Sequence, residues 1–203
     1  MNMTALEEKK ILKRSRILEA ASKLFMDKSF ASTAVDDVVK MAGVAKGTFY
    51  LYFKDKYDLL DQIISYKSAE VLRQGIALLD EKEKEAPMTL TEKGLFIADY
   101  TADYLAEHKD LAALLNKKLS SCFRNFAASG NEDFSGLMDM LTGELIKEGC
   151  TREQAEIKIY LVTDLIGSVC CDAVLGAGPY TLEQIRPEMK RTVAGILGGE
   201  IND

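Results

Sequence analysis

Two short helix patterns separated by one glycine occupy residues 33–53, and this spacing restricts the fold more than any other feature of the chain. The first pattern opens with Thr33, a favourable N-cap, and Asp36 stands three residues later, where a capping box places an acid. Gly43 follows the last apolar residue, where a helix often takes a left-handed residue. A second short helix is expected over 46–52. Two short helices joined by a tight turn containing glycine predict a helix-turn-helix.

Aromatic residues and lysines are mixed in the segment GTFYLYFKDKY, residues 47–57. Phe49 and Phe53 are four residues apart and share one helical face, so we expect both in the core. The outward residues of the second helix are then Lys46, Gly47, Thr48, Tyr50 and Tyr52. Such a mixture suits a surface that touches something both anionic and flat.

The remainder of the chain follows the helical period, with almost no alternating apolar and polar segments. An amphipathic helix is expected to begin before Ile11 and to end near Lys28. Further helices are expected over 56–79, 90–107, 110–128, 133–148, 151–175 and 181–197, with caps at Thr89 and Thr151 and a bend or restart at Pro187. The fold class is therefore expected to be all-α, with an N-terminal three-helix domain and a C-terminal helical bundle.

The net charge of −6 conceals opposite charges in the two parts of the chain. Residues 1–57 contain 11 Lys and Arg against 7 Asp and Glu, a net charge of +4, and the remainder contains 15 against 25, a net charge of −10. A basic segment on an acidic body is typical of nucleic-acid-binding proteins, although a solvated helix face has the same composition. No apolar run approaches the ~20 residues of a membrane span. With no secretory-signal pattern at the N-terminus, we expect a cytoplasmic protein without a membrane partner.

The chain has four cysteines and one histidine, so it has few residues that could bind a metal ion. Cys122, Cys150, Cys170 and Cys171 form no CxxC pair, and His108 lies in a charged segment. We expect no metal and no cofactor, and we expect buried thiols in a reducing compartment; redox sensing is the alternative. The sequence also lacks the GxSxG, HExxH, P-loop and dinucleotide-binding patterns, so an enzyme is not expected.

The segment from Ile17 to Leu60 resembles the DNA-binding domain of the tetracycline-repressor (TetR) family. The matching residues are ILEAASKLF followed by FASTAVDDVVKMAGVAKGTFYLYFKDKYDLL, and the combination of A-G-V, K-G-T-F-Y, Y-F and K-x-x-L-L is more specific than any single helix-turn-helix. Beyond Leu60 the resemblance is an all-helical pattern of fitting length. Ser29 departs from the family pattern, which usually has glycine after the first helix. A serine at positive φ costs on the order of 1 kcal/mol.

The resemblance implies that the second short helix lies in the major groove of DNA. Lys46, Thr48 and Tyr50 are the expected base-reading residues, and Gly47 allows the backbone to approach DNA closely. The expected phosphate contacts are Thr33, Tyr52 and Lys56, joined by Arg14 and Arg16 from the first helix. Each residue keeps a structural alternative, which is a solvated charge, a helix cap or a half-buried tyrosine.

For the rest of the chain, the resemblance implies a bundle that dimerises and holds a small ligand. We therefore expect residues 1–57 to bind DNA and residues 58–203 to bind the ligand and to dimerise. Small residues on the last two helices allow close helix approach, so the expected dimer residues are Gly167, Ser168, Cys171, Ala194, Gly195 and Gly198. Ordinary intramolecular packing is the alternative.

The middle helices contain aromatic, methionine and cysteine side chains that suit an adaptable apolar pocket. The expected ligand-binding residues are Phe96, Tyr100, Tyr104, Cys122, Phe123, Phe126, Met138 and Leu141, with plain core packing as the alternative. Asp99 and Asp103 lie beside two of these aromatics and favour a cationic lipophile, unless they belong to an exposed helix face.

Taken together, these features predict a ligand-responsive transcriptional regulator. We expect a homodimeric repressor on a near-palindromic double-stranded DNA operator, released by a small apolar or amphipathic effector. The alternative is a helix-turn-helix protein that is controlled by a protein partner or by cysteine oxidation.

Overall fold

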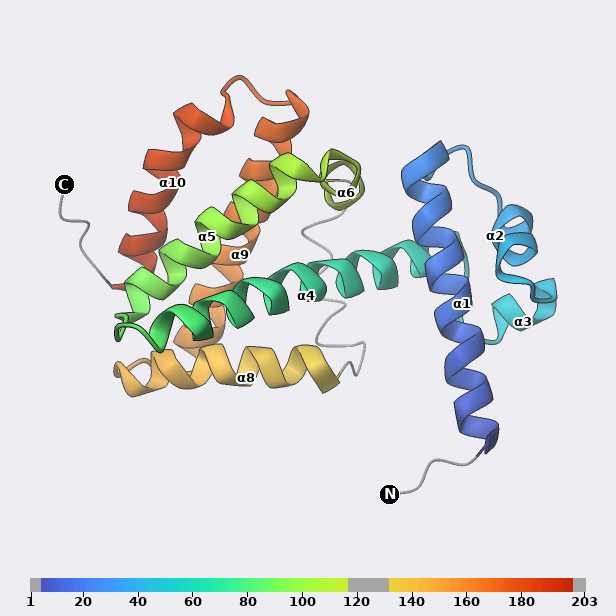
Figure 1. The fold of residues 1–203 in the computed structure, drawn as a ribbon, viewed down its shortest axis with the longest axis horizontal. Coiled ribbons are helices and arrows are strands. Elements are labelled where there is room, and N and C mark those ends of the chain that lie inside the picture. The colour runs from blue at the N-terminus through green and yellow to red at the C-terminus, as the bar shows by residue number, and fades with distance from the viewer. Residues whose placement is uncertain (1–4, 117–131, 199–203) are drawn as a thin grey trace. The chain divides into compact units, whose positions relative to one another are not determined.

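The computed structural model describes residues 5–116 and 132–198, and every regular element within them is an α-helix, so the all-α prediction is confirmed (Figure 1). The helices are α1 (Ala5–Lys28), α2 (Val35–Ala42), α3 (Lys46–Tyr50), α4 (Lys56–Glu83), α5 (Leu90–Glu107), α6 (Lys109–Leu115), α8 (Glu132–Lys147), α9 (Arg152–Leu175) and α10 (Leu182–Leu197). The chain divides into two compact units, Met1–Ile64 and Ser65–Asp203, at a point within α4. The functional boundary after residue 57 stays a prediction.

The first unit is built on the helical spacing of α1. Ile17, Ala21 and Leu24 recur at intervals of three and four residues, and all three are buried. α2 packs on α1 and contributes Val38, while α3 packs on α2 and contributes Phe49. The first turns of α4 complete this core with Leu59, Leu60, Ile63 and Ile64.

The start of α2 differs from the prediction by one residue. Its N-cap is Ala34, whose backbone N–H donates to the Asp37 carboxylate at 3.1 Å, so the predicted box of Thr33 and Asp36 is wrong. Thr33 is buried, and its hydroxyl donates to the Ser29 carbonyl at 2.9 Å. The Thr33 side chain therefore stabilises the turn between α1 and α2 instead of capping α2.

Two turns in the first unit have left-handed backbone. Gly43 ends α2 at φ 65°, as predicted, because glycine adopts this conformation without a steric penalty. Ser29 follows α1 at φ 75°, so this serine accepts a conformation that disfavours a side chain. The strain is on the order of 1 kcal/mol.

The second unit is organised around α9, which packs against α5, α6, α8 and α10 (Figure 1). Thr89, Thr151 and Thr181 cap α5, α9 and α10, each through a capping box, as the sequence predicts for the first two. α10 is one helix from Leu182 to Leu197 that contains Pro187, so the predicted restart does not occur. α4 continues to Glu83, one turn beyond its predicted end. None of the described helices is long and apolar enough to cross a membrane.

Candidate DNA-binding surface and ligand cavity

Two phenylalanines fix α3 in the first unit. Phe49 is fully buried and Phe53 nearly so, and their ring centroids lie 5.5 Å apart. The Tyr50 ring meets the Phe49 ring edge-on, with centroids 5.2 Å apart, yet Tyr50 remains 53% exposed. The side-chain division predicted from the i, i+4 spacing of the phenylalanines is therefore confirmed: the phenylalanines face inward, and Tyr50 forms part of the outer surface.

The outer surface of α3 is open and carries one ion pair. Lys46 and Gly47 are exposed, Thr48 is partly exposed, and a Cβ built on Gly47 would meet no atom within 4 Å. The Lys46 ammonium lies 2.8 Å from the Asp36 carboxylate of α2, and this hydrogen bond raises the pKa of Lys46. The pair is well exposed on both sides, so the ammonium remains accessible to a further anion.

Lys56 has a structural role that the sequence did not reveal. Its ammonium donates to the Phe30 carbonyl at 2.8 Å and to the Thr33 carbonyl at 2.9 Å, and it lies 4.3 Å from the Phe30 ring centroid. These contacts attach the first turn of α4 to the loop between α1 and α2. A phosphate contact by Lys56 stays a prediction.

Other predicted phosphate contacts also find partners within the unit. The buried Thr33 hydroxyl is turned inward, so it cannot supply the predicted contact. Arg14 donates to Gln62 at 2.6 Å, whereas Arg16 is exposed and Tyr52 is half-buried. Lys54, in the turn between α3 and α4, is an exposed cation that the sequence reading missed.

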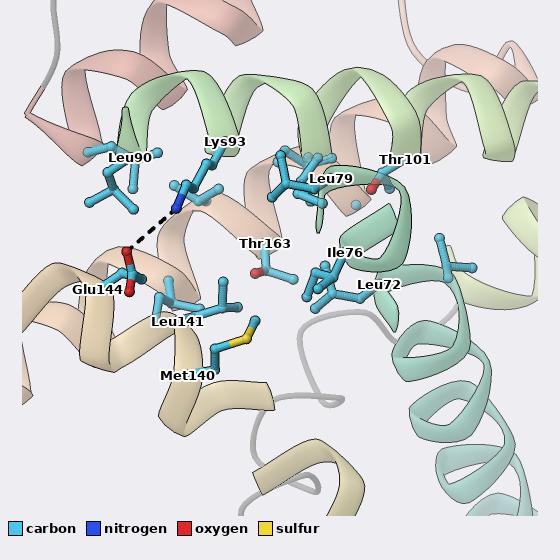
Figure 2. Close-up of a pocket in the computed structure, with 18 of the residues that line it drawn as sticks. Leu72, Ile76, Leu79, Leu90, Lys93, Thr101, Met140, Leu141, Glu144 and Thr163 are labelled. Carbon is cyan, nitrogen blue, oxygen red and sulfur yellow. Dashed lines mark ion pairs between the residues drawn. The ribbon is translucent and has the colours of Figure 1, made fainter. Parts of the chain in front are cut away.

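The second unit contains a cavity of about 280 Å³ between its helices (Figure 2). α4, α5, α8 and α9 supply most of the wall, while α6 and α10 contribute one leucine each. The apolar lining consists of Val71, Leu72, Ile76, Leu79, Leu90, Ile97, Leu105, Leu115, Met140, Leu141, Leu145, Ile159, Val162, Ile166 and Leu197. Ser68, Thr101 and Thr163 add hydroxyl groups to this wall. No aromatic side chain is among the described residues that line it.

One part of the cavity wall is charged. Lys93 of α5 lies 2.8 Å from Glu83 of α4 and 3.7 Å from Glu144 of α8, as the dashed line to Glu144 in Figure 2 marks. The hydrogen bond with Glu83 raises the pKa of Lys93, and the hydrogen bond from Lys147 lowers the pKa of Glu144. Asp80 also lines the cavity and is exposed. This cluster joins three helices at a half-exposed site.

Most of the predicted ligand residues lie elsewhere. Leu141 lines the cavity, but Phe96, Tyr100 and Tyr104 do not. Phe96 lies beneath the Lys82 ammonium, Tyr100 donates to Gln74, and Tyr104 stacks on His108. Cys122, Phe123 and Phe126 fall outside the described residues, and the Met138 side chain falls outside the described side chains. The other aliphatic residues that line the cavity were not among the predicted ligand-binding residues.

The acidic residues beside the tyrosines are paired within the chain. Arg186 of α10 donates to Asp99 at 3.1 Å and also to Asp103, and Lys190 lies 2.7 Å from Asp99. The predicted cationic site at this position finds no support, because neither carboxylate lines the cavity and basic residues of α10 pair with both.

Three of the predicted dimer residues are internal to the subunit. Gly167, Cys171 and Ala194 are buried, and Gly167 lines the cavity, which favours the alternative of intramolecular packing for these positions. Ser168, Gly195 and Gly198 are exposed. A different feature of α9 was missed: Ile157, Tyr160 and Leu161, which share one helical face, are 50%, 39% and 46% exposed.

The cysteines of α9 are poorly suited to redox chemistry. Burial raises the pKa of the Cys170 thiol to about 11 and that of the Cys171 thiol to about 12. A thiol must ionise before it reacts, so both are expected to be inert near neutral pH. Cys150 is only partly buried.

Comparison with known proteins identifies the family of residues 17–63. Residues 17–63 match the family model for bacterial regulatory proteins of the tetR family. The fatty acid metabolism regulator protein of Bacillus subtilis (strain 168) is 27% identical over 150 residues, which cover 72% of this chain and 75% of that protein. The transcriptional regulator AcrR of Shigella flexneri is 42% identical over 50 residues, which cover 25% of this chain and 23% of AcrR. Residues 17–63 therefore form a DNA-binding domain of the TetR family, as the sequence predicts.

Solved structures of TetR-family regulators share the whole fold. FadR from Bacillus subtilis, solved in complex with stearoyl-CoA, matches with a TM-score of 0.57 and 22% identity, covering 92% of this chain and 99% of that one. FadR from Bacillus halodurans, a fatty acid degradation regulator, matches with a TM-score of 0.56 and 21% identity, covering 92% and 95%. TetR-family proteins are DNA-binding transcriptional regulators that form dimers, and they are not enzymes. These likenesses, with the match of residues 17–63, support a regulatory role on DNA for this chain.

Proposed function

We propose that this TetR-family regulator is a homodimeric repressor that leaves its operator when a small apolar or amphipathic molecule fills the cavity of the second unit. The proposal is supported by one observation: the first unit has an open α3 surface, and the second unit has an apolar cavity. α4 contributes to both, through Lys56 in the first unit and through Leu72, Ile76 and Leu79 in the second.

The DNA surface is proposed from the exposed residues of α3 and its flanks. Lys46, Thr48 and Tyr50 would read base edges, and Gly47 leaves room for the duplex. Tyr52 and the newly found Lys54 would contact phosphate on the flank. Because basic residues displace counterions from DNA, operator affinity should fall steeply with salt.

The homodimer is proposed to form on the exposed face of α9. Ile157, Tyr160 and Leu161 are large side chains that remain 50%, 39% and 46% exposed on one face of α9, and Ser168 of α9 and Gly195 of α10 are exposed as well. Two copies joined by a two-fold axis would present two α3 helices to a near-palindromic operator. A cytoplasmic location follows from this role on DNA.

The ligand would act by favouring one of two arrangements of α4. An effector that prefers one arrangement shifts the equilibrium, and operator DNA that prefers the other must weaken effector binding by the same factor. The solved complex of Bacillus subtilis FadR with stearoyl-CoA supports an amphipathic effector for this fold, although not that particular molecule for this chain.

The experiment begins with duplexes selected from a random pool by the full-length protein. Decyl compounds with neutral, cationic and anionic headgroups are then tested for release of the selected duplex. We expect at least one of them to lower duplex affinity, and saturating duplex to weaken its binding equally. If every decyl compound that binds does so with the same affinity with and without duplex, the coupling is refuted.

Two variants of α4 locate the effect. Ile76→Phe places a larger side chain in the cavity wall and should abolish the ligand response while preserving duplex affinity. Leu78→Phe is the matched control, because Leu78 lies on the same helix, is 52% exposed and does not line the cavity. An unchanged response in Ile76→Phe would exclude the cavity as the effector site.

The alternative function, control by cysteine oxidation or by a protein partner, makes different predictions. The raised pKa values of Cys170 and Cys171 argue against oxidation at these two thiols. Oxidant-dependent loss of duplex affinity that disappears in Cys150→Ser or Cys122→Ser would favour the alternative.

A further inference from the structure

The charged part of the cavity wall is net negative. Among the described residues that line the cavity, Asp80, Glu83 and Glu144 are acidic and Lys93 is the single basic residue. These side chains carry three formal negative charges against one formal positive charge, and Lys147, which does not line the cavity, pairs with Glu144 at 2.6 Å as a second cation. The rest of the lining is aliphatic apart from hydroxyls and glycines, so charge selection among ligands takes place at this cluster.

The one lysine is already engaged by two carboxylates. Its ammonium lies 2.8 Å from Glu83 and 3.7 Å from Glu144, and the lysine side chain is only 21% exposed. An anionic headgroup would have to displace one of these carboxylates and then face the others. A carboxylate, by contrast, has several acceptor positions and accepts a second cation without losing the first.

The aliphatic lining restricts the rest of the ligand. Leucine, isoleucine, valine and methionine side chains surround the space, and no described aromatic ring is available to stack on a flat ligand. A flexible alkyl chain suits such a wall better than a planar dye does. The cation would be recognised by carboxylates and not by an aromatic cage.

We propose that the cavity binds a single-chain amphiphile with a cationic headgroup, an amine or a quaternary ammonium, whose alkyl chain lies among the aliphatic side chains and whose charge lies at Asp80, Glu83 and Glu144. This assignment rests on the proposed function, because it takes the cavity to be the effector site. It also distinguishes the chain from the relative solved with stearoyl-CoA, whose ligand carries a polyanionic headgroup.

The experiment compares headgroups on one chain length. Decyltrimethylammonium, decanol, decanoate and decanoyl-CoA are titrated into the full-length protein without DNA, below the concentrations at which they self-associate. We expect decyltrimethylammonium to bind roughly tenfold more tightly than decanol, and decanoate to bind more weakly than decanol; ion pairs at half-exposed sites support differences of this order. Decanoate or decanoyl-CoA binding more tightly than the cation would overturn the proposal.

Two charge variants are expected to act in opposite directions. Glu83→Gln removes one carboxylate and should weaken decyltrimethylammonium binding several-fold while leaving decanol unchanged. Lys93→Gln removes the competing cation and should strengthen it. Misfolding cannot explain tighter binding, so Lys93→Gln keeps the test valid if Glu83→Gln is unstable. Equal cation affinity in both variants and the wild type would contradict the proposal.

A control variant separates local from general charge effects. Glu81→Gln removes one negative charge from the same helix, but the Glu81 side chain is 71% exposed, pairs with Lys84 and does not line the cavity. We expect it to bind all four probes as the wild type does. A loss of cation affinity equal to that of Glu83→Gln would show that net charge, and not the cavity wall, selects the ligand.

The outcomes separate this inference from the function on which it rests. If decanol and decanoate bind as tightly as the cation and release DNA, the effector cavity stands and the headgroup assignment fails. If none of the four probes binds, both fail. If the cation binds most tightly but leaves DNA affinity unchanged, the headgroup assignment stands and the repressor mechanism fails.

Discussion

The two units of this regulator use their apolar residues for different purposes. In the first unit, Phe49 and Phe53 fill the space behind α3, and the outer surface is left to polar side chains and Tyr50. In the second unit, the aliphatic faces of several helices meet without filling the space between them, and a cavity of about 280 Å³ remains. A surface that must hold a fixed shape is supported by a dense core, whereas a unit that must accommodate a ligand leaves part of its interior open.

The two units also differ in how they hold charge. Lys56 in the first unit is fixed by backbone carbonyls, which do not titrate. Lys93 in the second unit is held by Glu83 and Glu144, which do titrate and which a ligand can engage. The contacts of Lys56 stabilise the fold, whereas the ion pairs of Lys93 can change when a ligand binds. The predictions below test this contrast.

The largest expected effect is on the core of the first unit. Phe49→Ala should lower the free energy of unfolding by roughly 3–5 kcal/mol, since it removes a fully buried ring from a packed core. Phe96→Ala is the matched change in the second unit, where the ring is half-buried beneath Lys82, and its cost should be well below that of Phe49→Ala. Denaturant unfolding followed by circular dichroism measures both. Equal losses would mean that the two units are packed alike.

The next effect concerns recognition and not stability. Tyr50→Ala and Lys46→Ala should each weaken binding to the selected duplex by on the order of 1–3 kcal/mol and reduce discrimination against scrambled duplexes. Lys46→Ala should change stability by no more than about 0.5 kcal/mol because the side chain is exposed, and Tyr50→Ala should cost about 0.5–1.5 kcal/mol because it loses the edge-on contact with Phe49. Tyr180→Ala, at an exposed tyrosine of the second unit, is the control and should leave DNA affinity unchanged. Unfolding of Tyr50→Ala would contradict the outward position of this ring.

The fold and the exposed face of α3 were largely predictable from local sequence. Capping boxes at Thr89 and Thr151, the glycine after α2 and the spacing of Phe49 and Phe53 each act within one or two helical turns, and the structure contains all of them. The N-cap of α2 was predicted one residue too early, at Thr33, because threonine is a favoured N-cap and alanine is a poor one. In the structure the Thr33 hydroxyl donates to the Leu24 and Ser29 carbonyls, so it points inward and Ala34 takes the N-cap position.

The cavity could not be predicted in the same way. Ile76, Leu145 and Ile166 have the periodicity of ordinary core residues, and only the meeting of α4, α8 and α9 leaves a space beside them. Aromatic residues were predicted to line the pocket because they are common in ligand sites. Tyr100 and Tyr104 instead contact Gln74 and His108. Long-range ion pairs such as Lys93 with Glu144 likewise have no signature in the sequence.

A smaller effect should separate two neighbouring lysines of the first unit. Lys56→Met should lower the free energy of unfolding by roughly 1–2 kcal/mol, because two carbonyls lose a charged donor while the alkyl stem is kept. Lys54→Met should leave stability unchanged and weaken binding to all duplexes alike, since a phosphate contact carries no base information. Unfolding and DNA-binding titrations distinguish the two. A stability loss in Lys54→Met, with weaker DNA binding but unchanged stability in Lys56→Met, would contradict the roles proposed for these two lysines.

The smallest expected effect tests the titratable cluster of the second unit. Glu144→Gln should lower the free energy of unfolding by less than about 1 kcal/mol at pH 7, because the side chain is 36% exposed and solvent screens its pairs with Lys147 and Lys93. The hydrogen bond from Lys147 holds the pKa of Glu144 below its ordinary value of 4.5, so the carboxylate stabilises the fold above pH 4.5. That contribution is lost as the pH falls through the lowered pKa.

The difference in the free energy of unfolding between wild type and Glu144→Gln should therefore be constant near neutrality, shrink below pH 4.5 and diminish in high salt. Denaturant unfolding at several pH values and two salt concentrations measures it, with Lys56→Met as the reference, since its effect does not depend on an acid group and should persist down to low pH. A Glu144→Gln difference that grew on acidification would mean that this glutamate is destabilised as a carboxylate, and the charged wall would then be a source of strain that a cationic ligand relieves.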